Sequence, residues 1–127
     1  MSRLAWICLG GALGTGARYL LSGFAAAELG TVFPWGTLAV NVIGSLLLGA
    51  IMHVGLTTSL LSPTLRMTLG TGVLGGFTTY STFNYETLRQ LQDGAWPLAL
   101  TYVGVTLFGC LAAGWAGVTL ARAVWGG

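Results

Sequence analysis

The chain has 127 residues, a length that suits one domain over residues 1–127, and only 6% of them are charged. Soluble proteins carry about 25% charged residues, so a composition that is 54% hydrophobic and lacks lysine excludes a water-soluble fold and predicts an integral membrane protein. The net charge of +2 is spread along the chain without a basic cluster, which argues against nucleic acid as a partner.

Four stretches are long and apolar enough to cross a bilayer as helices, which takes about 20 residues. A polar and aromatic loop separates the first two, and its Phe33, Pro34 and Trp35 suit the membrane interface. The third and fourth stretches each begin at a proline, a residue that favours the first turn of a helix. The sequence therefore predicts an all-α membrane protein whose four transmembrane helices span Leu4–Phe24, Thr37–Leu56, Pro63–Gln92 and Pro97–Val124.

The arginines are distributed almost evenly between the two sides of this predicted bundle. Arg3, Arg66 and Arg122 fall on the side of the termini, whereas Arg89 falls on the opposite side and Arg18 lies deep in the first helix. Basic residues near the membrane surfaces set the orientation of a helix bundle, so this distribution permits insertion both ways and an antiparallel, dual-topology homodimer. The alternative is that so short a chain has too few arginines for their distribution to indicate its orientation in the membrane.

Small residues recur four positions apart in the predicted helices. Gly10 and Gly14 form a GxxxG pair in the first helix, and Gly72 and Gly76 form another in the third. Such pairs let two helix backbones approach closely in lipid. We interpret them as packing positions.

The stretch GGFTTYSTFNYE, which starts at Gly75, is polar although it lies in the middle of the third predicted helix. Gly75 and Gly76 weaken a helix, and the hydroxyl side chains that follow compete with its backbone hydrogen bonds. We therefore predict a broken third helix that runs to about Gly76, unwinds briefly and resumes near Thr79. Either Thr79 or Ser81 suits the cap of the second half.

Non-helical backbone at membrane depth is tolerated where it is buried in protein or lines a water-filled cavity. Its freed carbonyl oxygens suit a small hard cation, and the N-terminus of the resumed helix favours an anion. The alternative is a helix kinked at its glycines, whose hydroxyls bond to their own backbone. A double glycine followed by four Ser or Thr hydroxyls within five positions favours a functional break.

This stretch, together with WGTLAVNVIGS and GGALGTGARYLL, resembles the Fluc/CrcB family of small fluoride channels over nearly the whole chain. The resemblance implies four-helix subunits that form antiparallel, dual-topology homodimers with two fluoride pores and a central structural sodium ion. It implies a fluoride-selective channel in the cell (inner) membrane, which exports fluoride passively and relieves fluoride toxicity. The implied partners are fluoride, a second copy of the chain and the lipid bilayer.

The resemblance also assigns roles to residues of the break and the second helix. The backbone carbonyls of Gly75 and Thr78, from both subunits, would coordinate Na⁺. Asn41 matches the pore asparagine of the family, although a lone amide in a membrane helix also commonly bonds to a neighbouring helix. Phe83 matches the second pore-lining phenylalanine, and Tyr80 replaces the first, which is a departure from the family pattern.

Further polar residues complete the implied fluoride path. Tyr102 and Thr106 match polar pore positions, and they share one helix face because they are four residues apart. Thr82 and Glu86 also share a face and extend the path, but Glu86 could equally form an ion pair with nearby Arg89. Arg18 matches an arginine that lies near the pore entrance in the family. The alternative is that its side chain only anchors the first helix at the membrane interface.

Rival functions require features that this sequence lacks. A small, dual-topology, proton-coupled multidrug antiporter, the main alternative, needs a carboxylate deep in a span, usually the first, and Leu4–Phe24 has none. A membrane subunit without transport activity would use the polar break only for structure. The chain offers no Ser/His/Asp, metal-ligand or paired-carboxylate set, so we do not expect an enzyme.

Overall fold

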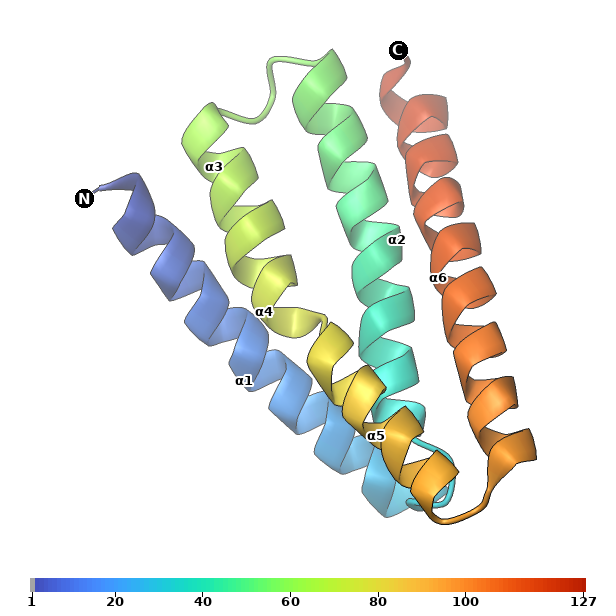
Figure 1. Cartoon of the computed structure of the whole chain (residues 1–127). Helices are drawn as coiled ribbons and strands as arrows, with labels where there is room; N and C mark the ends of the chain where they lie inside the picture. The colour runs from blue at the N-terminus through green and yellow to red at the C-terminus, as the bar shows by residue number, and fades with distance from the viewer. Residues whose placement is uncertain (1) are drawn as a thin grey trace.

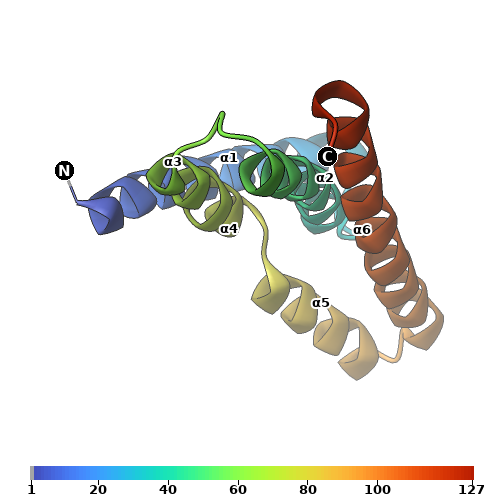
Figure 2. The same cartoon turned by 90° about the horizontal axis from the view of Figure 1, so that it is seen from above.

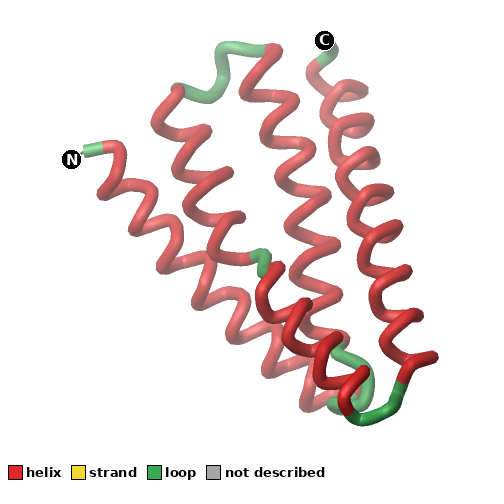
Figure 3. Tube along the Cα trace, in the orientation of Figure 1, coloured by secondary structure: helices red, strands yellow, loops and turns green. Residues whose placement is uncertain are grey.

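The computed structural model describes residues 2–127, which form helices joined by short loops, without a strand (Figures 1 and 3). This agrees with the predicted all-α class. Three of the helices, α1, α2 and α6, are long and apolar enough to cross a membrane. In chain order the elements are α1 (Arg3–Leu29), α2 (Trp35–Thr57), α3 (Pro63–Met67), the π-helix η1 (Thr68–Leu74), α4 (Gly75–Phe77), α5 (Tyr80–Gln92) and α6 (Trp96–Trp125).

Helix α1 is longer than the sequence suggested. It was expected to end near Phe24 but continues to Leu29, because residues 25–27 are alanines, the strongest helix formers. It stops at Gly30, whose φ of 82° lies in the left-handed region that glycine adopts without strain. The predicted loop before α2 is therefore shorter than expected.

Residues 63–92, from α3 to α5, make up the third helical segment. Its first half, α3, η1 and α4, is a continuous helical stretch, and its second half is α5. Seven residues of the first half are π-helical, a feature that the sequence analysis did not anticipate. Figure 2 shows α1, the first half and α2 in one layer, while α5 stands away from this layer toward one end of α6.

The first half packs against α1 at backbone distance. A methyl group placed on Gly72 would lie 2.7 Å from the carbonyl oxygen of Ile7, and one on Gly10 would lie 2.7 Å from that of Thr68. A methyl group on Gly14 would overlap the carbonyl of Val73. These glycines allow the close approach that GxxxG pairs predict, which confirms the packing interpretation.

The other long helix pair, α2 and α6, is built in the same way. A side chain on Gly117 of α6 would overlap the carbonyl of Leu46, and one on Gly49 of α2 would meet the carbonyl of Gly114 at 2.5 Å. Helix α5 packs against α6 and, less extensively, against α2. The break in the third segment therefore faces α2 on one side and α1 on the other.

Candidate functional site

The third helical segment is interrupted at two residues. Thr78 (φ −85°, ψ 158°) and Thr79 (φ −152°, ψ 115°) are extended, and α5 starts at Tyr80. The hydroxyl of Thr79 accepts a hydrogen bond from the backbone N–H of Thr82 at 3.2 Å, so Thr79 is the cap and Ser81 lies inside the helix. The first half thus reaches Phe77, one residue beyond the expected end.

The glycine pair before this interruption has a different role from the one expected. Gly75 has helical backbone angles, φ −63° and ψ −37°, and Gly76 also lies within α4. A methyl group on Gly76 would lie 2.6 Å from the carbonyl oxygen of Gly11 in α1. Gly76 therefore permits contact with α1, and the helix is interrupted at Thr78 and Thr79, beyond both glycines.

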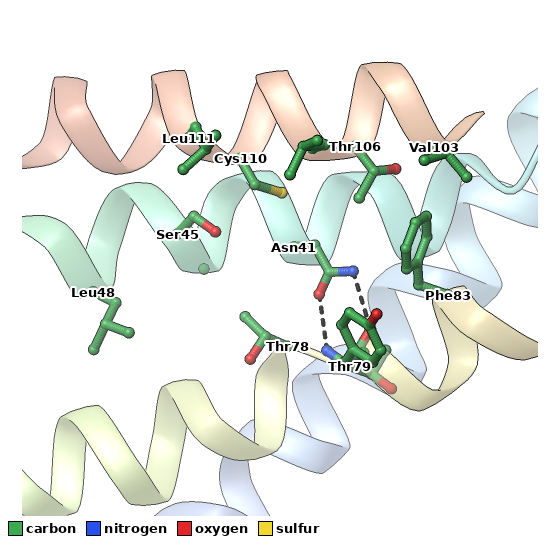
Figure 4. A pocket seen from close by; sticks show the side chains of 13 residues that line it. Asn41, Ser45, Leu48, Thr78, Thr79, Phe83, Val103, Thr106, Cys110 and Leu111 are labelled. Carbon is green, nitrogen blue, oxygen red and sulfur yellow. Dashed lines mark hydrogen bonds between the residues drawn. The ribbon is translucent and has the colours of Figure 1, made fainter. Parts of the chain in front are cut away.

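The side chain of Asn41, from α2, holds the extended backbone (Figure 4). Its Nδ2 donates to the carbonyl of Thr79 at 3.0 Å, and the N–H of Thr79 donates to its Oδ1 at 2.8 Å. Both polar backbone groups of Thr79 are thereby satisfied away from water, where an unmade hydrogen bond costs about 1–3 kcal/mol. One N–H and one lone pair of the amide remain for another ligand.

Arg18, from α1, binds the other side of the interruption. Its Nε donates to the carbonyl oxygen of Gly76 at 3.0 Å, and the side chain is half-buried. The positive charge lies at the C-terminal end of the first half, where the helix dipole favours a cation. Arg18 is thus anchored to protein backbone within the bundle, and its assignment to a pore entrance stays a prediction.

The carbonyl groups of residues 75–78 lose their helical partners at the interruption, and those of Gly75 and Thr78 are two of them. The N–H of Thr79, which would bond to the carbonyl of Gly75 in a continuous helix, donates to Asn41 instead. In a continuous helix the N–H of Thr82 would bond to the carbonyl of Thr78. Here it donates to the hydroxyl of Thr79, so the carbonyl of Thr78 lacks this partner. Both oxygens are neutral, hard ligands of the kind that small cations bind.

A cavity of about 600 Å³ lies between α2, α6 and the interruption (Figure 4). It brings together five of the predicted site residues, and every residue that lines it is uncharged. These five are Asn41, Thr78, Tyr80, Phe83 and Thr106. Cys110 also lines it, one helical turn beyond Thr106. The hydroxyl of Thr106 is buried and has no hydrogen-bond partner among residues 2–127.

Aromatic rings connect the cavity to the far end of α5. The ring of Phe83 lies 5.0 Å from that of Tyr102 and 5.9 Å from that of Tyr80, both in edge-to-face geometry. Tyr102 is completely buried, and its hydroxyl donates to Glu86 at 3.0 Å. The Thr82 hydroxyl accepts from that of Thr79 within the cap, and the extension of the path through Thr82 and Glu86 stays a prediction.

One aromatic residue near this site was not anticipated as part of it. Phe33, which the sequence analysis assigned to the membrane interface, packs its ring edge-to-face with that of Tyr102 at 5.4 Å. The only sequence pattern that could have indicated this contact is the run Phe33–Pro34–Trp35. That pattern does not show whether the rings face lipid or protein.

The fold and this site together define a multi-pass membrane protein with a polar interruption beside an uncharged cavity. Residues 5–118 match the family described as CrcB-like protein, Camphor Resistance (CrcB), and the chain belongs to this family. The chain is 57% identical over 122 residues to the Fluoride-specific ion channel FluC of Sorangium cellulosum (strain So ce56), covering 96% of both chains.

Two further relatives carry the same name. The chain is 52% identical over 122 residues to that of Anaeromyxobacter dehalogenans (strain 2CP-1 / ATCC BAA-258), which covers 96% of this chain and 97% of the relative. It is 48% identical over 124 residues to that of Citrifermentans bemidjiense (strain ATCC BAA-1014 / DSM 16622 / JCM 12645 / Bem). This alignment covers 98% of this chain and 100% of the relative. The matches extend over nearly the full length of each protein.

Proposed function

We propose that this chain is a fluoride-specific ion channel that lets fluoride leave the cell passively and so relieves fluoride toxicity. The observation that carries the proposal is the full-length identity, up to 57%, to relatives named as fluoride-specific ion channels. An inside-negative membrane potential drives a monovalent anion outward by about 2.3 kcal/mol per 100 mV, so export needs no coupled energy source. The proposed activity is transport, and no chemical reaction is implied.

The site offers the kind of ligands that this transport requires. Fluoride is small and strongly hydrated, so a pore has to replace the hydrogen-bond donors of water without holding the ion too tightly. The second N–H of Asn41, the unpartnered hydroxyl of Thr106 and the electropositive ring edge of Phe83 are weak, neutral donors. Several weak sites allow passage, whereas a fixed positive charge in the cavity would trap the anion.

The rival proton-coupled antiporter finds no support in α1. Its one acidic residue, Glu28, is exposed and lies in the last turn of the helix, far from the middle of the span. A carboxylate there remains in contact with water and is poorly suited to couple proton movement to transport at the membrane centre. Family membership favours the channel over this alternative.

The test is a fluoride efflux measurement on purified protein in liposomes. With a potassium diffusion potential, fluoride is expected to leave rapidly, as followed with a fluoride electrode, while chloride is retained. Protein-free liposomes provide the background rate. Equal efflux of chloride, or fluoride efflux at the background rate, would contradict the proposed function.

The functional unit of this proposal is an antiparallel homodimer in the cell membrane. Tyr80 at the cavity is 78% exposed and Tyr85 on the same helix 61% exposed, so one chain leaves the face of α5 uncovered. Ser81 on the same helix is also exposed, and a polar side chain in a membrane helix is more favourable against protein than against lipid. The near-even arginine distribution permits the two copies to insert in opposite directions.

Labelling of the termini tests this topology. A single cysteine introduced near the C-terminus, at exposed Gly127, is expected to react with a membrane-impermeant reagent from both sides of the membrane. The native cysteines, Cys8 and Cys110, are replaced by serine in this background. Labelling from one side alone would contradict dual topology.

A structural Na⁺ at the dimer centre fits two of the carbonyl groups released at the interruption. Gly75 and Thr78 supply two neutral oxygens per chain, and two chains would supply four, a suitable donor set for a hard cation. Such an ion would tie together the interrupted segments of the two subunits. Replacing sodium by N-methylglucamine is expected to reduce the thermal stability of the dimer, and an unchanged midpoint would contradict this site.

A further inference from the structure

The loop between α1 and α2, residues 30–34, turns the side chain of Phe33 into the protein rather than toward lipid. Its ring lies 5.4 Å from that of Tyr102 with an interplanar angle of 80°. Tyr102 is 0% exposed, and its ring also meets Phe83 at 5.0 Å and 65°. Two aromatic rings, one from the loop and one from α5, therefore pack edge-to-face against the Tyr102 ring.

Phe33 is itself held in place by its neighbours in the loop. The N–H of Trp35 donates to the carbonyl of Phe33 at 2.8 Å, and the ring of Trp35 lies 4.6 Å from that of Phe33. Pro34 between them restricts the backbone to one range of φ. A side chain on so constrained a loop presents its ring in one position, which suits it to orient a neighbour.

The hydroxyl of Tyr102 is the group whose position depends on this packing. It donates to Glu86 at 3.0 Å, across the gap between α6 and α5. A tyrosine hydroxyl lies at the far end of its ring, so a small rotation of the side chain moves it away from its hydrogen-bond partner. Removing one of two edge-to-face contacts leaves a void into which the ring can turn.

We propose that Phe33 is a positioning residue for ion conduction, which acts by holding the hydroxyl of Tyr102 against Glu86. The inference rests on the proposed fluoride channel function, in which Tyr102 lies along the path. It gives the α1–α2 loop a part in transport beyond anchoring at the membrane interface. Phe33 itself need not touch the ion.

The test combines substitutions at the two positions with fluoride efflux from liposomes. Phe33→Leu is expected to slow efflux about three- to tenfold, the factor that corresponds to the loss of one aromatic pair. Phe33→Tyr keeps the ring and is expected to restore at least half of the wild-type rate. Val32→Ala, at an 83% exposed position in the same loop, is the matched control and is expected to leave the rate unchanged.

A second pair of variants separates positioning from general structural support. In a Tyr102→Phe background there is no hydroxyl to position, so adding Phe33→Leu is expected to change the remaining rate less than about twofold. An equal slowing in both backgrounds would show that Phe33 acts without the Tyr102 hydroxyl and would overturn the inference. Wild-type efflux by Phe33→Leu would also overturn it.

The same experiment distinguishes failure of this inference from failure of the proposed function. Wild-type protein that releases no fluoride overturns the channel proposal itself, whereas normal wild-type release with an inert Phe33→Leu overturns only the role of the loop. Each variant is first checked for a single symmetric peak in size-exclusion chromatography. If Phe33→Leu does not fold, Phe33→Met, which also lacks a ring, takes its place with the same expected results.

Discussion

The two halves of the third helical segment belong to one stretch of chain but are held in different ways. The first half lies against α1 with glycines in contact with backbone on both sides, for example Gly14 against Val73 and Gly76 against Gly11. The second half, α5, packs on α6 and α2 and carries hydroxyl, carboxyl and aromatic side chains. Close packing through glycines suits support, whereas a looser surface with exposed polar and aromatic side chains suits contact with an ion.

The interruption between the halves is where these two environments meet. Side chains from two other helices bind backbone groups on its two sides: Asn41 of α2 binds Thr79, and Arg18 of α1 binds the carbonyl of Gly76. The interruption is therefore stabilised from outside the third segment as well as by the Thr79 cap. The polar run therefore does not unwind the helix alone; the surrounding helices supply partners that make the extended backbone stable.

The largest expected effect comes from disturbing the close contact of the first half. Gly14→Ala would place a methyl group on the carbonyl of Val73 and force α1 away from η1, at a cost of about 1–3 kcal/mol or more. We expect loss of most folded protein, measured by size-exclusion chromatography and thermal midpoint. Gly16→Ala, with nothing within 4 Å of the new methyl, is the control. A normal midpoint for Gly14→Ala would show that the contact is not structural.

Removing the amide that holds the interruption should affect conduction next most strongly. Asn41→Ala leaves the N–H of Thr79 without a partner and removes one of the two hydrogen bonds to its carbonyl, which costs about 1–3 kcal/mol and frees the extended backbone to move. We expect fluoride efflux to fall about fivefold or more, because a loss of about 1 kcal/mol corresponds to about a factor of five. Asn84→Ala removes an exposed amide from α5 and is expected to conduct normally. Equal rates for the two variants would refute the role of Asn41.

A smaller effect is expected from the cap of the second half. Thr79→Val removes the hydroxyl that accepts from Thr82 and should lower stability by about 0.5–2 kcal/mol, a typical value for an N-cap. Thr79→Ser keeps the hydroxyl and should retain most of the stability. Chemical or thermal unfolding of the detergent-solubilised protein measures both. The cap would be dispensable if valine and serine gave the same midpoint.

Features that depend on local sequence could be predicted, and those that depend on distant contacts could not. The helices followed from apolar length and the GxxxG contacts from the spacing of glycines. The hydroxyl side chains narrowed the cap to Thr79 or Ser81, and the structure selects Thr79. The hydrogen bonds of Asn41 to Thr79 and of Arg18 to Gly76 join residues 38 and 58 positions apart in sequence, so no local pattern reveals them.

Two further features escaped prediction for different physical reasons. The π-helical turn at η1 differs from an α-helix by one residue in hydrogen-bond register, and amino-acid propensities do not distinguish the two. The inward turn of Phe33 depends on whether Tyr102 offers a ring to pack against, which only the three-dimensional arrangement decides.

The central claim, that the second half carries the ion path while the first half supports it, is tested most directly by fluoride efflux through Phe83→Ile. Phe83 lines the cavity and packs on Tyr102, so we expect slower efflux with an unchanged size-exclusion profile and thermal midpoint. Phe108→Ile, the same substitution at a 70% exposed position of α6 outside the cavity lining, is the control and should conduct at the wild-type rate. Wild-type efflux by Phe83→Ile would contradict the claim.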